Sequence, residues 1–212
     1  MFPTLNLTER GKVGMMDGKI YKAMEFMMNA FLLNILWLVM CLPLITIFPA
    51  TTAMFAVVRE WKNRGDIRIF ATFFKKWKEN FKQSIVIGII WLIFTGVLLG
   101  DLMITNQLNS NVKYILFSFF FLLLILYLFV SIYIFPVIVH YQVTWKNAIK
   151  NALLLSISRL HNTILSIGVL IGAIALCFYF PAAMMLSFSL GAYLIHSLVS
   201  RGFHLENEAE VS

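Results

Sequence analysis

The sequence predicts an all-α, polytopic transmembrane helical bundle, and two observations support this prediction. Of the 212 residues, 60% are apolar and only 13% are charged, whereas a soluble domain is nearer half apolar and a quarter charged. Four runs of the chain are also apolar over roughly the 20 residues that a helix needs to cross a bilayer. A soluble globule of this size needs a polar exterior that this composition cannot supply.

The first membrane element is expected to be a proline-broken hairpin within residues 23–58, which contain a single charged residue near their start. Its two limbs would be helices at about 24–42 and 49–61, connected through Pro43 and Pro49. The second limb has only about ten apolar residues, which is short for a crossing. The sequence leaves open whether this limb spans the membrane fully or is re-entrant.

The rest of the chain is expected to contain four full spans and two interfacial helices. In each interfacial helix, aromatic and apolar side chains recur at helical spacing on one face, and lysines occupy the other positions. Pro181 should end or kink a helix and so separate the last two spans. The spans are predicted at about 83–105, 114–140, 163–180 and 182–200, and the interfacial helices at about 66–82 and 144–160. Residues 1–200 would form a single integral membrane domain, followed by a polar tail at 201–212.

The net charge of +7 would suggest nucleic acid as the partner of a soluble protein, but the positions of the cations indicate a membrane partner. With the hairpin, 16 of the 17 Lys and Arg residues fall on one side of the membrane, and only Lys113 falls on the other. With a single crossing in residues 23–58, the split would be 12 to 5. Because retained Lys and Arg mark the cytoplasmic side, we expect cytoplasmic termini, an anionic inner leaflet as the partner surface, and no nucleic acid.

Polar side chains around the proline-broken hairpin form a candidate intramembrane site. Free N–H groups at a helix start near Pro49 would attract anions or sugar hydroxyls. The same polar groups could instead satisfy the broken backbone of a structural turn, which is the favoured interpretation. The residues of this candidate site are Asn29, Asn34, Thr46, Pro49, Thr51 and Thr52.

Two further sets of residues are candidate contact surfaces. The basic interfacial helices are suited to anionic headgroups or to a partner protein, through Phe70, Phe74, Lys75, Lys76, Trp77, Lys78, Trp145, Lys146 and Lys150. Small residues spaced four apart let helices approach closely, and this pattern occurs at Gly96 and Gly100 and again at Gly168 and Gly172. We expect these glycines to pack within the chain's own bundle, and a partner interface is the alternative.

Motifs typical of enzymes and metal sites are missing from the sequence. It contains no His-Glu-x-x-His pair, no Gly-x-Ser-x-Gly elbow and no phosphate-cradling glycine loop. The ionisable residues Asp101, His140 and His196 fall near the ends of the predicted spans, whereas a coupled transporter usually has such a group at mid-bilayer. We therefore expect no catalytic residue, no cofactor and no metal site, and a protein that is not an enzyme.

The stretch from Gly18 to Trp61 resembles the YesL family of small bacterial multipass membrane proteins. The matching features are Asn34, Leu36-Trp37, Pro43, Phe48-Pro49-Ala50-Thr51 and the run Met54–Arg59. These proteins carry a domain of unknown function. The resemblance implies a multi-pass protein of the bacterial plasma membrane, of a kind often associated genetically with carbohydrate-uptake transporters of the ABC type or with polysaccharide use, and it supplies no catalytic residues.

The leading functional hypothesis is a non-enzymatic accessory or regulatory partner of a carbohydrate-uptake transporter, with ABC-type transporter subunits as its partners. The alternative is that the chain itself conducts or transports a neutral solute through the broken-helix region from Pro43 to Thr52. The sequence leaves the ligand, the partner's identity and the oligomeric state open.

Overall fold

The computed structural model describes residues 7–65, 67–107, 112–141 and 144–211, and the side chains of residues 18–200 within these ranges. All regular elements of the described ranges are helices, which confirms the all-α prediction. Five of these helices are long and apolar enough to cross a membrane. The elements are α1 (Leu7–Cys41), η1 (Leu44–Thr46), α2 (Ile47–Arg64), α3 (Ile69–Gln107), α4 (Val112–Tyr141), α5 (Trp145–Ser158), α6 (Leu160–Tyr179), η2 (Pro181–Ala183) and α7 (Met184–Val211).

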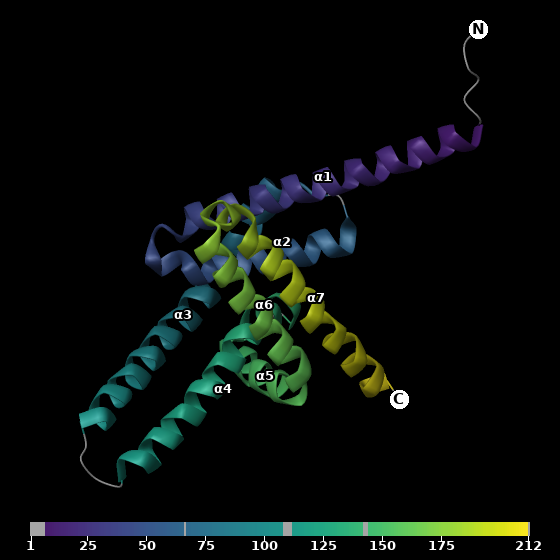
Figure 1. Ribbon diagram of the computed structural model, residues 1–212. Helices are drawn as coiled ribbons and strands as arrows, with labels where there is room; N and C mark the ends of the chain where they lie inside the picture. Colours follow the sequence, from purple (N-terminus) through teal and green to yellow (C-terminus); the bar gives the residue numbers. More distant parts are fainter. Residues whose placement is uncertain (1–6, 66, 108–111, 142–143, 212) are drawn as a thin grey trace.

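The chain reverses direction between α1 and α2, as the predicted hairpin requires (Figure 1). α1 ends at Cys41, just before Pro43, and α2 begins at Ile47, two residues before Pro49. A proline in the first turn of a helix removes no intrahelical hydrogen bond, so Pro49 is compatible with this start. α2 ends at Arg64 and is followed by Gly65, whose φ of 78° lies in the left-handed region that favours glycine.

α2 is the central helix of the bundle. It contacts α1, α3, α4 and α7, and its residues from Ala53 to Val58 are all buried. α2 is not among the five candidate spans, because its last turns, from Arg59 to Arg64, are polar. The fully buried core around it includes Leu33 of α1, Phe73 and Ile87 of α3, Ile134, Val137 and Ile138 of α4, Ala148 of α5 and Val199 of α7.

Two predicted boundaries are wrong. The interfacial helix expected at 66–82 and the span expected at 83–105 form one helix, α3. α3 contains no Pro, and Gly88, the glycine nearest to Gln83, lies within the helix, so nothing in the local backbone ends the helix at Gln83. At 1.5 Å per residue α3 is about 58 Å long, and its basic first part extends beyond its apolar part. The residues from 201 onward, which were expected to form a tail, continue α7 to Val211. The side chains of residues 201–211, and Ser212 as a whole, lie outside the described residues.

The later helices form two hairpins. The later part of α3 and the earlier part of α4 extend together away from α1 and α2, whereas α6 and α7 form a separate pair that meets α1 (Figure 1). The turn between α6 and α7 is η2, which begins at Pro181. α5 is a separate amphipathic helix that packs on α4 through the buried Ala148 and Ala152.

Candidate functional site

The hydroxyl groups beside the proline-broken turn are hydrogen-bonded within the chain. The Thr46 hydroxyl lies 2.6 Å from the carbonyl oxygens of both Met40 and Pro43, and so closes the turn after α1. The Thr51 hydroxyl donates to the Ile47 carbonyl oxygen at 2.7 Å and accepts the indole N–H of Trp37 at 3.1 Å. The hydroxyl groups of Thr46 and Thr51 are thus hydrogen-bonded to groups of the turn and of the adjacent helices. This arrangement is typical of a structural turn rather than of an open ligand site.

The two asparagines of the candidate site differ in their surroundings. Asn34 is fully buried and bonds α7: its Nδ2 donates to the Met184 carbonyl oxygen at 2.6 Å, and its Oδ1 accepts the Ser189 backbone N–H at 3.2 Å. Asn29 is only half-buried on α1. The sequence allowed both asparagines to bond the broken backbone of the turn, but the hydrogen bonds of Asn34 go to α7 instead.

A close contact between α2 and α3 is built on Ser84 and Gly88, which are also small residues spaced four apart. The Ser84 hydroxyl donates to the Thr52 hydroxyl at 2.9 Å, and Thr52 in turn donates to the Phe48 carbonyl oxygen at 3.0 Å. One turn further on, a Cβ on Gly88 would lie 2.9 Å from Cγ of Phe48. The sequence prediction missed this contact, although the Ser-x-x-x-Gly spacing was a signal for it.

The four glycines that were expected to pack inside the bundle do not do so. A Cβ built on Gly96, Gly100, Gly168 or Gly172 would meet nothing within 4 Å. These residues lie on outward faces of α3 and α6, so packing within the chain is a wrong interpretation of them. Their faces are open to whatever surrounds the bundle.

The aromatic and basic residues expected at the membrane surface have several different environments. Phe70, Lys75 and Lys78 are exposed, whereas Phe74 and Trp77 are half-buried. On α5, the Lys146 ammonium lies 5.3 Å from the ring centroid of Trp145, and Lys146, Trp145 and Lys150 are exposed. Phe73, which was not among the predicted contact residues, is fully buried and anchors this part of α3 in the core.

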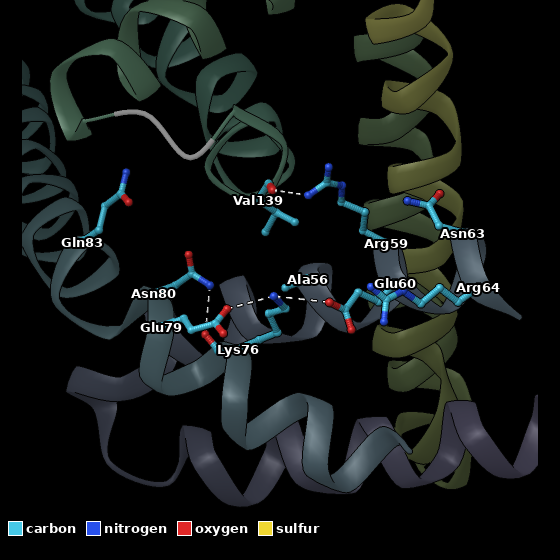
Figure 2. Close-up of a pocket in the computed structure, with 10 residues that line it drawn as sticks. All are labelled: Ala56, Arg59, Glu60, Asn63, Arg64, Lys76, Glu79, Asn80, Gln83 and Val139. Carbon is cyan, nitrogen blue, oxygen red and sulfur yellow. Dashed lines mark hydrogen bonds and ion pairs between the residues drawn. The ribbon is translucent and has the colours of Figure 1, made fainter. Parts of the chain in front are cut away.

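A polar cavity of about 610 Å³ lies where α2, the basic part of α3 and the end of α4 meet (Figure 2). Most of its lining residues are charged or carry a side-chain amide. It is lined by Ala56, Arg59, Glu60, Asn63 and Arg64 of α2, by Lys76, Glu79, Asn80 and Gln83 of α3, and by Val139 of α4.

Lys76 is held between two carboxylates in this cavity, as Figure 2 shows. Its ammonium lies 2.9 Å from an oxygen of Glu79 and 3.3 Å from an oxygen of Glu60. The hydrogen bond with Glu79 is the main cause that raises the pKa of Lys76 above its ordinary value, and the contact with Glu60 adds to it. This group of three charges therefore links α2 to α3 and carries one net negative charge.

Arg59 reaches from α2 to the end of α4, where it donates to the Val139 carbonyl oxygen at 2.7 Å. Val139 lies in the last turn of α4, where carbonyl groups have no partner within the helix and the helix dipole is negative. The half-buried guanidinium of Arg59 thus caps α4 and is fixed in direction beside the cavity.

The remaining ionisable groups of the described residues do not form a metal site: no group of three or more His, Cys, Asp or Glu side chains there could hold an ion. His196 is 3% exposed on α7, and no described group lies within hydrogen-bonding distance of its Nδ1. Asp101 lies near the C-terminal end of α3 and is half-buried.

Comparisons with known proteins find a matching domain and three relatives. Residues 30–102 match the model described as "Protein of unknown function, DUF624". Uncharacterized protein YesL of Bacillus subtilis (strain 168) is 29% identical over 183 residues, which are 84% of this chain and 86% of that protein. Uncharacterized protein YteU of the same organism is 28% identical and covers 77% of this chain and 75% of its own length.

A third relative, Uncharacterized protein YesV of Bacillus subtilis (strain 168), is 29% identical over 66% of this chain and 69% of its own length. No solved structure gives a significant match. The matched domain and the three relatives confirm the resemblance found in the sequence, and the five apolar helices are those of a multi-pass membrane protein. These matches support a YesL-like family of proteins whose function is unknown.

Proposed function

We propose that the protein is a non-enzymatic accessory subunit that assembles in the bacterial plasma membrane with a carbohydrate-uptake transporter of the ABC type. The observation that supports assembly is the pair of uncovered glycine faces, Gly96 with Gly100 on α3 and Gly168 with Gly172 on α6. The carbohydrate transporter as the partner comes from the family resemblance alone.

The glycine faces support assembly because helices in a membrane associate through close packing and not through the hydrophobic effect. Lipid tails are as apolar as leucine, so a face gains most from a partner helix where small residues let the two backbones approach. Within the described residues, the chain provides no such partner for either face. A helix of another membrane protein would fit against each of them.

Affinity capture from native membranes tests this assembly. We expect carbohydrate-transporter subunits to copurify with the protein, and the Gly96→Leu/Gly100→Leu and Gly168→Leu/Gly172→Leu pairs to lower their recovery at least about fivefold, because a leucine side chain keeps the backbones apart. Gly18→Leu is the matched control, since a Cβ at Gly18 also meets nothing within 4 Å and lies outside both faces.

Two results would contradict the accessory role. One is recovery of the protein alone, together with unchanged sugar uptake after deletion of the chain. The other is solute flux through liposomes that contain only this protein, which would support the alternative of transport through the Pro43–Thr52 region.

The proposed orientation has both termini in the cytoplasm, so that the basic parts of α3 and α5 face the anionic inner leaflet. The test uses a chain in which the native Cys41 and Cys177 are replaced by Ser. A thiol reagent that cannot cross the membrane, added outside the cell, should label a single cysteine placed at Ile45. The same reagent should not label a single cysteine placed at Asn63. Both side chains are exposed, at opposite ends of the hairpin's second limb. External labelling of both positions would overturn this orientation.

A further inference from the structure

We propose that the polar cavity between α2, α3 and α4 binds a phosphate-bearing anion through Arg59 and Arg64. The site is separate from the glycine faces, and the inference does not depend on the proposed assembly. A volume of about 610 Å³ is within the usual range for sites of small ligands. The question is therefore which chemistry the lining favours.

The two carboxylates of the cavity are already paired with a cation. Glu60 and Glu79 both contact the Lys76 ammonium, at 3.3 and 2.9 Å. This triad keeps one net negative charge, so the two guanidinium groups give the cavity lining a net charge of +1. The bond that fixes Arg59 goes to a neutral carbonyl group. An anion entering the cavity would thus meet two cations that no described carboxylate neutralises by direct contact.

The geometry of the arginines suits phosphate in particular. A guanidinium presents five N–H donors in a rigid fork that matches the oxygens of a phosphate group. Arg59 uses one nitrogen, Nη1, for the Val139 carbonyl oxygen, which leaves other donors while the contact holds the side chain in place. Arg64 lies on the same helix, five residues further on, and is exposed.

Neutral donors and the position in the bundle add to this recognition. Asn63 and Asn80 line the same cavity, and the Asn80 amide is fixed by donation to the Lys76 carbonyl oxygen at 2.9 Å. Basic pockets between the ends of membrane helices are typical sites for the phosphate of a lipid headgroup. A soluble phosphate compound offers the same oxygens, so the shared chemistry is the phosphate group.

Calorimetric titration of the full chain in uncharged detergent tests the proposal and separates the two sources. One arm uses inorganic phosphate, and the other uses short-chain phosphatidylglycerol. We expect saturable binding of one equivalent in at least one arm. Saturation by the lipid only assigns a headgroup site, and saturation by inorganic phosphate assigns a site for soluble phosphate compounds. Absence of saturable binding in both arms would overturn the proposal.

Variants test whether the bound anion lies in the cavity. Arg64→Gln, which removes no hydrogen bond found among the described residues, should weaken binding about tenfold. Arg59→Lys keeps the positive charge but loses the planar set of guanidinium donors, and should weaken binding severalfold. Thermal unfolding of this variant checks that the protein is still folded. Lys78→Gln is the matched control, since it removes one positive charge from the exposed face of α3. An equal loss in the control and in Arg64→Gln would assign the binding to general surface charge and overturn the proposal.

Discussion

Gly88→Ala is expected to lower the free energy of unfolding by about 1–3 kcal/mol, although alanine is ordinarily the better helix former. The added Cβ would lie 2.9 Å from Cγ and 3.1 Å from Cβ of Phe48. The Phe48 ring cannot move aside freely, because it packs against Trp91 and Phe135, with centroid distances of 6.4 and 5.5 Å. The helices α2 and α3 would therefore have to separate at the contact that joins them most closely.

Thermal unfolding in detergent measures this effect, and Gly96→Ala provides the matched control on the same helix. A Cβ at Gly96 meets nothing within 4 Å, so this substitution should leave the midpoint unchanged or raise it slightly. In a double-mutant cycle, Phe48→Ala should remove most of the cost of Gly88→Ala, because the two groups are in direct contact. Equal midpoints for the two glycine variants would show that the close approach does not limit stability.

Local signals in the sequence predicted the helices and turns well. The apolar runs are as long as a bilayer is thick, and Pro43 and Pro181 stand at places where the backbone cannot continue a helix without loss. The boundary near Gln83 was wrong for the same kind of reason. The composition changes there from basic to apolar, but a change of composition does not end a helix when no breaker is present.

Which face of a helix points inward was not predictable from spacing. Ser84 and Gly88 have the same spacing as Gly96 and Gly100, yet only the first pair is buried against α2. At 3.6 residues per turn, the positions eight and twelve residues after Gly88 are rotated by roughly 80° and 120° from it. The spacing of small residues is the same in both pairs, and the position of α2 decides which pair is buried.

The polar cavity depends on contacts that no local pattern contains. The sequence placed Lys76 among the lysines of a headgroup-facing surface, and the neighbouring Lys75 and Lys78 are indeed exposed. Lys76 itself turns toward Glu60 of α2, so its partner is determined by the packing of two helices. Arg59 and Val139 are likewise 80 residues apart in the chain. A pairing of this kind requires the tertiary structure.

Asn34→Ala is expected to lower the free energy of unfolding by about 1–3 kcal/mol, since it removes one buried and one part-buried hydrogen bond and leaves a cavity. The two bonds, at 2.6 and 3.2 Å, join α1 to the first turns of α7, with little water available to replace them. Asn34→Asp should lower the free energy of unfolding at least as much, because a carboxylate oxygen would face the Met184 carbonyl oxygen in place of the amide donor.

Asn29→Ala is the control on the same helix, and its half-buried side chain should contribute within about 0.5 kcal/mol of zero. If Asn34→Ala and Asn29→Ala unfold at the same temperature in detergent, the α1–α7 contact depends on apolar packing such as that of Trp37 with Phe188, whose ring centroids lie 4.8 Å apart, and not on the amide.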